Sequence, residues 1–324
     1  MQFAGEGERS MKGLVMKSLG DLEEVTELVS NLAIPQPDNG EIRVKISAAS
    51  VNPIDWRRAY PQYGSGCTFP AVPGVDGAGV VDAVGEGVHL HSVGDRVHFH
   101  TKFPAAHGSL AEFAICLETS AVSVPDDVGF DVACALPCAA WTAYEALYDR
   151  LRIGTAKKGT TIYIPGGAGG VGQFAVQMAL GEALTVITSG GSDSSISHLK
   201  SLGCQLVLNY NSDDIVAEIM KFTNDEGVSL AFETVSNENC ATTVKALGFA
   251  ASIVSIVNAI ADESIFMKGV TAHHVLLGAH AFQKSQQQRE LFQEFGEATL
   301  TLLQKGTLTV DITSRSPLDG AKQQ

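Results

Sequence analysis

Residues 164–172 read IPGGAGGVG and contain the residue types that bind a phosphate group. Gly167, Gly169 and Gly172 have the spacing G-x-G-x-x-G. Glycines at these positions permit a tight turn and let backbone N–H groups approach a pyrophosphate, and a helix that starts there adds the positive end of its dipole. Because glycine-rich loops are common, the motif predicts a dinucleotide site only where it follows a strand and opens a helix.

The residues around this loop supply that context. Residues 161–164 read TIYI, which is typical of a buried strand, and residues 173–180 continue with helical spacing. Strand-like runs then alternate with helical segments, at residues 184–188, 206–208, 230–233 and 253–257. This alternation predicts a doubly wound parallel sheet and therefore an α/β fold. We expect the loop to contact a pyrophosphate through Gly167, Gly169, Gly170 and Val171.

The residues that follow the second strand of this region bear on the choice of dinucleotide. An acidic residue about 20 residues after the glycine loop would indicate NAD, because it accepts hydrogen bonds from the ribose hydroxyls. Here the strand ends near Ser189, and the first acidic residue after it is Asp193. Ser189 and Ser192 are able to donate to a 2′-phosphate, which favours NADPH. No lysine or arginine stands close by, since the nearest bases are His198 and Lys200, and the serines also fit an ordinary loop.

The first part of the chain has a different pattern. Short strand-like runs at residues 13–16, 41–46 and 79–84 are separated by Gly, Pro and Asp. Strands at this spacing, with turn residues between them, predict a small antiparallel, barrel-like domain. The first ten residues, MQFAGEGERS, are expected to form a flexible leader.

Composition narrows the classes of function. The chain has 324 residues, of which 45% are hydrophobic, and is long enough for about two domains. Its formal net charge of −14 argues against a nucleic-acid partner, which needs a basic face. No apolar run reaches the roughly 18 residues of a membrane helix. Six cysteines without a C-x-x-C pair are expected to be reduced thiols of a cytoplasmic protein.

Five further segments resemble those of the medium-chain dehydrogenase/reductase superfamily, in particular of its zinc-free quinone oxidoreductase (zeta-crystallin-like) branch. They are AASVNPID at residues 48–55, PGVDGAGV at 73–80, VGDRV at 93–97, GSLAEF at 108–113 and LPCAAWTAYEAL at 136–147. The resemblance implies a GroES-like antiparallel β-barrel domain and a Rossmann domain. It divides the chain into a leader (1–11), a GroES-like catalytic domain (12–132), a Rossmann nucleotide-binding domain (133–266) and a return to the catalytic domain (267–324) with a shortened C-terminus.

The branch is indicated by metal ligands that are missing. Zinc-dependent relatives need a thiolate, an imidazole and a third ligand around an open tetrahedral metal. This chain has Asn52 in place of the first Cys and Gly74-Val75-Asp76 in place of Gly-His-Glu, and only Cys138 remains at a ligand position. We therefore expect no metal. Four other histidines alternate along the chain with a period that fits polar positions near a strand and turn: His89, His91, His98 and His100.

Without a metal, the substrate must already accept hydride well, as quinones and α,β-unsaturated carbonyls do. The resemblance places Asn52 near the nicotinamide and the reduced oxygen, where its amide would donate a hydrogen bond without titrating. It places Thr142 at the nicotinamide ribose or carboxamide, and Ser189 and Tyr210 near the 2′-phosphate. The remaining cofactor contacts that it implies also have a plain core-packing interpretation: Val235, Ser255, Ile256, Val257, Leu276, Leu277 and Gly278.

Tyr60 and Tyr63 are candidates for lining the substrate cleft and for donating a proton, with water as the alternative donor. Two residues depart from the family pattern, since Glu233 and Ser236 stand where relatives usually have Asp and Gly. The resemblance also implies a homodimer through an edge strand near residues 260–271. The favoured function is an NADPH-dependent quinone oxidoreductase. The alternatives are an enone or alkenal reductase and a non-enzymatic NADPH-binding protein of the crystallin-like or RNA-binding kind.

Overall fold

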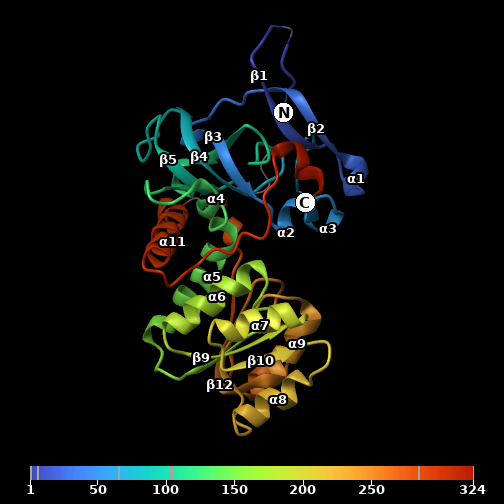
Figure 1. Cartoon of the computed structure of the whole chain (residues 1–324), viewed down its shortest axis with the longest axis vertical. Coiled ribbons are helices and arrows are strands. Elements are labelled where there is room, and N and C mark those ends of the chain that lie inside the picture. The colour runs from blue at the N-terminus through green and yellow to red at the C-terminus, as the bar shows by residue number, and fades with distance from the viewer. Residues whose placement is uncertain (1, 6, 65, 103–105, 284, 324) are drawn as a thin grey trace. The chain divides into compact units, whose positions relative to one another are not determined.

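The computed structural model describes residues 2–5, 7–64, 66–102, 106–283 and 285–323 (Figure 1). The chain divides into two compact units. Unit 1 comprises Met1–Cys138, Gly278–Thr301 and Val310–Gln324, and unit 2 comprises Ala139–Leu277 and Leu302–Thr309. Within the described residues, no helix is both long enough and apolar enough to cross a membrane.

Unit 2 is built on a six-stranded parallel sheet (Figure 1). Numbered from the strand before the glycine loop, the order is 3-2-1-4-5-6, that of a Rossmann-type sheet, which binds ligands beyond the carboxyl ends of its strands. The parallel sheet predicted from the strand–helix alternation is confirmed. In spatial order the strands are β10 (Leu206–Asn209), β9 (Thr185–Gly190), β8 (Thr161–Ile164), β11 (Val228–Glu233), β12 (Leu247–Ser255) and β13 (Thr271–His274).

Helical segments lead into this sheet and connect its strands. A continuous helical stretch precedes β8 and consists of η2 (Pro137–Trp141), α5 (Thr142–Tyr144) and η3 (Glu145–Arg150), with η2 and η3 in wide π-type turns. Helices pack against the strands that flank them in sequence, as α7 does against β9 and β10. The other segments are η4 (Ile153–Thr155), α6 (Gly170–Gly181), α7 (Asp193–Ser201), α8 (Ile215–Phe222), α9 (Asn237–Ala246) and α10 (Ser264–Met267).

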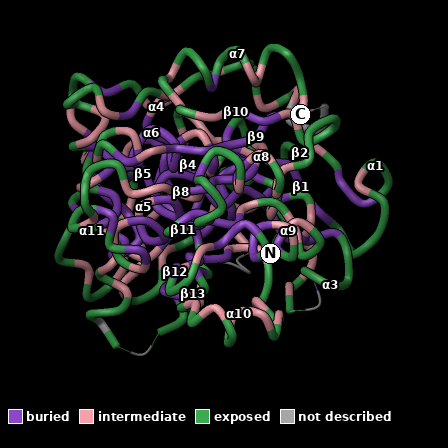
Figure 2. Tube along the Cα trace, turned by 90° about the horizontal axis from the view of Figure 1, so that it is seen from below, coloured by how far each residue is buried: buried purple, intermediate pink, exposed green. Residues whose placement is uncertain are grey.

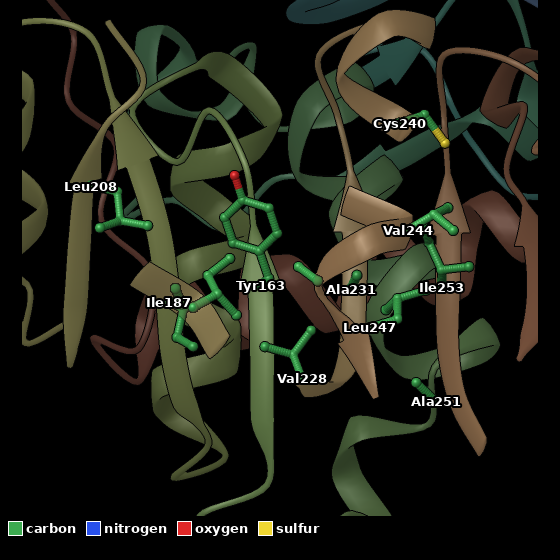
Figure 3. Close-up of a cluster of buried hydrophobic side chains, with 12 residues drawn as sticks. Tyr163, Ile187, Leu208, Val228, Ala231, Cys240, Val244, Leu247, Ala251 and Ile253 are labelled. Carbon is green, nitrogen blue, oxygen red and sulfur yellow. The ribbon is translucent and has the colours of Figure 1, made fainter. Parts of the chain in front are cut away.

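Buried side chains from strands and helices form a core of unit 2 (Figure 3). Figure 3 shows Tyr163 of β8 between Ile187 of β9 and Ala231 of β11, and Val244 of α9 belongs to the same cluster. These strands are apolar along their length, as parallel strands covered on both faces require. The core fixes the strands and thereby positions the loops at their carboxyl ends.

Unit 1 contains a five-stranded antiparallel sheet and a separate two-stranded ribbon. Val44, Val81 and Phe99 pack in the core of the five-stranded sheet. Figure 2 shows the buried trace running through the strands, whereas connecting loops are exposed. The predicted antiparallel domain is confirmed. The sheet order is β6 (Phe113–Leu117), β3 (Glu41–Ser50), β4 (Asp76–Val84), β5 (Arg96–His100) and β7 (Ala121–Ser123), and the ribbon pairs β1 (Ser10–Met16) with β2 (Thr26–Ala33).

Short helices and one long helix complete unit 1. The long helix packs on it through Phe292, whose ring stacks on His100 at a centroid separation of 5.7 Å. The segments are α1 (Leu22–Val25), α2 (Pro53–Arg57), α3 (Pro61–Gly64), η1 (Glu118–Ser120), α4 (Phe130–Ala133), η5 (Leu277–Phe282), α11 (Gln286–Gln304) and η6 (Leu318–Gln323).

The boundaries between the units differ from the expected ones. Unit 2 begins at Ala139 rather than at 133, and it extends to Leu277 rather than 266 because β13 completes the parallel sheet. Residues 302–309 also belong to unit 2, since the Thr309 backbone N–H donates to Gln177 Oε1 at 2.7 Å. β12 ends at Ser255, two residues earlier than the predicted strand.

Two segments are packed into unit 1 that were expected to be a flexible leader and polar positions near a strand and turn. In the expected leader, Ala4 N donates to Asn31 O at 2.8 Å and Ala33 N donates to Gln2 O at 3.0 Å, so free backbone groups of β2 are satisfied. His98 and His100, expected at polar positions near a strand and turn, lie fully buried on β5. Each ring Nδ1 donates to a carbonyl oxygen, and burial lowers the pKa of each imidazole to about 4.

Candidate functional site

The predicted cofactor residues of unit 2 gather where its parallel strands end. β8 ends at Ile164, immediately before the glycine loop, and β10 ends immediately before Tyr210. Val235 follows the end of β11, and Ser255 is the last residue of β12. The carboxyl ends of parallel strands lie at one edge of a sheet, and ligands of doubly wound sheets bind there. The residues predicted from the sequence therefore lie at or after the carboxyl ends of strands, at one edge of the parallel sheet.

The glycine loop fits a dinucleotide. A Cβ atom on Gly167 would lie 2.1 Å from Thr188 Oγ1, and one on Gly172 would lie 2.2 Å from the carbonyl oxygen of Gly166, so close packing requires glycine at both positions. A Cβ atom on Gly170 would meet no atom within 4 Å. Gly170 is the first residue of α6, whose leading N–H groups have no partner within the helix. These donors and the open space before them are what a pyrophosphate requires.

Ser189 holds the glycine loop through a hydrogen bond to the loop backbone. Its side chain is only 2% exposed, and its Oγ accepts a hydrogen bond from Gly166 N at 3.2 Å. It also hydrogen-bonds Tyr163, whose pKa burial raises to about 12. The Ser189 hydroxyl is therefore engaged within the protein, in contrast to the phosphate contact expected from the sequence.

The exposed hydroxyl groups near the end of β9 belong to serines that follow Ser189 in the sequence. Ser192 and Ser194 are exposed, and Ser192 Oγ caps α7 by accepting from Ser195 N at 3.2 Å. Tyr210 is 58% exposed. Its hydroxyl oxygen would lie only 2.0 Å from a Cβ atom on Gly191, so the two loops approach each other closely at this glycine. The loops after β9 and β10 thus present exposed hydroxyl groups, and they also carry carboxylates: Asp193 begins α7, and Asp213 Oδ2 accepts from Asn209 N at the end of β10 at 2.8 Å.

Glu233 organises the loop after β11. It is fully buried, and its two carboxylate oxygens accept four hydrogen bonds. Oε1 accepts from Val235 N at 2.7 Å and from Ser236 N at 3.3 Å, and Oε2 accepts from Asn239 Nδ2 at 2.8 Å and Thr243 Oγ1 at 2.7 Å. Ser236 in turn caps α9. Both departures from the family pattern therefore have a structural role in this loop.

The loops after β8 and β11 meet at the point where the strand order reverses. Thr234 Oγ1 donates to Pro165 O at 2.8 Å, and a Cβ on Gly166 would lie 3.0 Å from Val235 Cγ2. This reversal point is the general ligand position of such sheets. Val235 is accordingly placed beside the glycine loop.

The other predicted cofactor contacts differ in accessibility. Ser255 is 1% exposed and its Oγ accepts from Val257 N at 3.3 Å, whereas Leu276 is 75% exposed. Thr142 is buried on α5 and Leu277 is buried after β13. Ile256 is half-buried, and Gly278 belongs to unit 1. The structure does not assign these residues to a common surface.

In unit 1, three segments meet around the Asp76 carboxylate. Asn52 stands at the start of α2, Asp76 is the first residue of β4, and Cys138 lies in η2. Asp76 Oδ2 accepts from Asn52 Nδ2 at 2.8 Å and from Ser50 Oγ at 3.2 Å, and both carboxylate oxygens lie 3.0 Å from Cys138 N. Asp76 is fully buried. Burial raises the pKa of its carboxyl group well above the ordinary value, and the nearby Asp55 raises it further.

A second buried carboxylate stabilises the start of α2. Asp55 Oδ2 accepts from Asn52 N at 2.7 Å, and Oδ1 accepts from Val75 N at 2.8 Å and Gly74 N at 3.2 Å. Burial raises the pKa of Asp55 to about 6, against the opposing effect of these N–H donors and of Arg58. Asp55 thus ties α2 to the segment before β4.

The donor set at this point does not fit zinc. Val75 has no donor atom, and the Asn52 amide directs its NH2 group at Asp76. Burial raises the pKa of the Cys138 thiol well above its usual range, with Asp76 and Asp55 acting in the same direction, so the thiolate that zinc prefers is disfavoured. Within the described residues, no group of three or more His, Cys, Asp or Glu is arranged to hold a metal ion.

Tyr60 and Tyr63 belong to an exposed aromatic cluster at α2 and α3. The rings of Trp56 and Tyr60 meet edge to face with centroids 6.2 Å apart. The Arg57 guanidinium lies 5.4 Å from the Trp56 ring centroid and 5.7 Å from that of Tyr63, within range for cation–π attraction. Sequence reasoning missed Trp56 and Arg57 as members of this cluster, although they directly follow the Asn52 motif.

Two models of protein families match the chain. A zinc-binding dehydrogenase family matches residues 170–298, and an alcohol dehydrogenase GroES-like domain matches residues 38–126. The first lies mainly in unit 2 and the second in unit 1.

Individual relatives extend over nearly the whole chain. A quinone oxidoreductase of Rattus norvegicus is 27% identical over 318 residues, 98% of this chain and 93% of the relative. A zinc-type alcohol dehydrogenase-like protein of Staphylococcus epidermidis is 32% identical over 253 residues, 76% of this chain and 74% of the relative. The crystal structure of a Pseudomonas syringae quinone oxidoreductase has a TM-score of 0.85 and 25% identity and covers 97% of this chain and 94% of that one.

Proposed function

Because the chain belongs to the medium-chain dehydrogenase/reductase superfamily, in its quinone oxidoreductase branch, we propose that it transfers hydride from NADPH to a quinone without a metal. The oxidoreductase class and the use of a nicotinamide cofactor follow from the family. The bound nicotinamide would supply the hydride. The chain's own task is to bind and orient the two reactants.

The cofactor is held by the edge of the parallel sheet. The leading N–H groups of α6, at Gly170 and Val171, would bind the pyrophosphate, and Gly167 and Gly172 keep the loop close to the helix. Val235 would contact the cofactor from the neighbouring loop.

The preference for NADPH is supported by the surface beyond β9. This surface presents the hydroxyl groups of Ser192, Ser194 and Tyr210, and residues 189–192 after β9 include no acidic side chain, the first being Asp193. A 2′-phosphate can accept hydrogen bonds from hydroxyl groups, whereas a carboxylate there would repel it. We assign the phosphate contact to Ser192 and Tyr210, with Ser189 as support for the loop.

The observation that carries the quinone proposal is the donor set around Asp76. An amide, an apolar side chain and a protonated thiol do not form a Lewis-acid site that could polarise an ordinary carbonyl. A quinone needs no such polarisation, because the charge that arrives with hydride is delocalised over its ring. The aromatic cluster of Trp56, Tyr60 and Tyr63 offers flat surfaces for such a ring.

The test compares cofactors in quinone reduction by the wild-type chain and by Ser192→Asp. We expect kcat/KM with NADPH to exceed that with NADH in the wild type. The added carboxylate is expected to lower kcat/KM with NADPH about tenfold or more while leaving that with NADH within about threefold. The opposite change, Asp193→Ser, removes the exposed carboxylate of the next residue and is expected to leave kcat/KM with NADPH unchanged or raised. Equal use of both cofactors by both proteins would contradict the NADPH assignment.

Two further properties belong to the proposal. The edge strand β13 has backbone groups available for pairing, and Phe266 and Met267 on α10 are strongly exposed beside it. Edge strands and exposed apolar patches favour association, so we propose a homodimer through this edge. All six cysteines are free thiols, which supports a cytoplasmic location.

A further inference from the structure

Arg57 of the aromatic cluster contacts two rings but has no anionic partner in the described part of the chain. Its guanidinium carbon lies 5.4 Å from the Trp56 ring centroid and 5.7 Å from that of Tyr63. It forms no ion pair or side-chain hydrogen bond with a described residue. Its N–H groups are therefore available to an anion from outside the chain. Other arginines of the chain instead pair with carboxylates, namely Arg43, Arg96, Arg150 and Arg315.

The two short helices that carry these side chains are fixed by unit 1 alone (Figure 1). On α2, the buried Asp55 accepts from Val75 N at 2.8 Å and so ties the helix to the segment before β4. α3, which carries Tyr63, packs closely on the end of α2, since a Cβ atom on Gly64 would lie 2.0 Å from the carbonyl oxygen of Arg58. A ligand that binds here therefore meets side chains on a fixed backbone, which lowers the entropic cost of binding.

The chemistry of the cluster matches a ligand that combines a ring with an acidic group. Trp56 is 40% exposed and Tyr63 is 45% exposed, so part of each side chain is open to a second aromatic ring. A guanidinium presents parallel N–H donors that fit a carboxylate, sulfonate or phosphate group. The formal net charge of −14 disfavours anions over the molecule in general, so an anion bound here would be selected by the local cation.

We propose that Arg57, Trp56 and Tyr63 form a binding site for an aromatic ligand with an acidic group, with the ring against the two aromatic side chains and the acidic group on the guanidinium. Binding at this site requires neither cofactor nor unit 2. The inference rests on the proposed function in one respect, since there the ligand is the hydride acceptor. The preferred acceptor is then a quinone with an acidic substituent.

The test measures equilibrium binding by calorimetry, without cofactor, for three probes. Naphthalene-2-sulfonate has the ring and the acidic group, naphthalene-2-methanol has the ring alone, and methanesulfonate has the acidic group alone. Arg57→Gln removes the cation, and Trp56→Leu removes one ring. Arg9→Gln is the matched control, because it removes the same charge from another exposed position of unit 1. Thermal unfolding establishes that each variant is folded.

The wild type should bind naphthalene-2-sulfonate about tenfold more tightly than naphthalene-2-methanol, and methanesulfonate more weakly than either. In Arg57→Gln the preference for the sulfonate should shrink to less than about twofold, whereas Arg9→Gln should retain it. Trp56→Leu should weaken both ring probes by about fivefold, because each loses one aromatic contact.

Three results would overturn the inference. The first is equal affinity of the wild type for naphthalene-2-sulfonate and naphthalene-2-methanol, and the second is methanesulfonate binding as tightly as naphthalene-2-sulfonate, so that the ring contributes nothing. Both are measured on the wild-type chain and do not depend on the folding of a variant. The third is a sulfonate preference that persists in a folded Arg57→Gln.

Steady-state NADPH oxidation separates this inference from the proposed function. Arg57→Gln should raise KM for anthraquinone-2-sulfonate by about tenfold and leave that for the neutral 2-methyl-1,4-naphthoquinone within about twofold. A wild-type chain that binds naphthalene-2-sulfonate through Arg57 but reduces no quinone would retain the site and lose the proposed function. Reduction of both quinones with KM values that Arg57→Gln leaves unchanged would retain the proposed function and contradict the inference.

Discussion

At the residue scale, the two buried carboxylates beside Asn52 each accept hydrogen bonds from three donor groups of the protein. Asp55 accepts from three backbone N–H groups, and Asp76 accepts from Asn52, Ser50 and Cys138. Carboxylates that are buried and hydrogen-bonded in this way link segments of the fold. For the proposed quinone reduction we therefore expect the proton to come from a different group or from water.

Tyr60 and Tyr63 provide a test of that conclusion. We expect Tyr60→Phe and Tyr63→Phe each to lower kcat by less than about tenfold, because both side chains are exposed to water and their rings keep the contacts with Trp56 and Arg57. The measurement is steady-state quinone reduction with saturating NADPH. Tyr148→Phe, which removes a hydrogen bond to Glu182 in unit 2, is the matched control. A loss above about a hundredfold with unchanged NADPH affinity would identify a catalytic acid instead.

At the scale of elements, a substitution at the start of α6 can distinguish an effect on stability from an effect on cofactor binding. The Gly170 position is open, and alanine is favoured over glycine in a helix by up to about 1 kcal/mol. We expect Gly170→Ala to leave the melting temperature unchanged or raised, while weakening NADPH binding at least about tenfold because the added methyl group occupies the space of the pyrophosphate.

Fluorescence titration with NADPH and thermal unfolding measure the two effects. Gly154→Ala serves as the control, since a Cβ there would make an ordinary contact with the Tyr148 ring at 3.6 Å. Unaltered NADPH affinity in a stable Gly170→Ala would argue against the pyrophosphate site at α6.

The strand β5 makes the stability of unit 1 depend on pH. His98 and His100 are buried as neutral imidazoles, and their pKa of about 4 in the folded chain lies below the ordinary value of 6.5. A depressed pKa means that the stabilisation is complete above pH 6.5 and is lost as pH falls toward 4. Between pH 7 and pH 5 the loss is about 2 kcal/mol for each histidine.

Urea unfolding at these two pH values measures this loss. The variant His100→Gln retains a donor for the Thr101 carbonyl, and its unfolding free energy should fall about 2 kcal/mol less than that of the wild type. His89→Gln, at an exposed position, should behave as the wild type does. An equal pH dependence in all three proteins would show that His100 is not buried as a neutral group.

The elements differed in how far the sequence could predict them. The parallel sheet was predictable because β8 and β9 are apolar runs whose burial depends on their own residue types. The burial of His98 was not, because the carbonyl that accepts from its ring belongs to Ala133, 35 residues away. The same applies to Asp76 and Asn52, which are 24 residues apart and meet only when β3 and β4 pair. Ser189 was assigned to the ligand since nothing in the sequence places its hydroxyl beneath Gly166.

At the scale of the whole molecule, each of the two units has its own hydrophobic core. In the proposed function, the parallel sheet of unit 2 would hold the cofactor. Unit 1 contains the polar cluster around Asp76, which does not suit a metal, and the exposed aromatic side chains. The proposal of metal-free hydride transfer depends on both. It predicts that the acceptor, rather than a Lewis acid, supplies the electrophilic character of the substrate.

The most direct test of this claim follows NADPH oxidation after treatment of the protein with a strong chelator, using quinones, enones and simple ketones as acceptors. The account predicts that quinones are reduced at the same rate before and after chelation, and that simple ketones are not reduced. Reduction of enones alone would replace the quinone assignment with a double-bond reductase. Quinone reduction that is abolished by the chelator and restored by zinc would contradict the account.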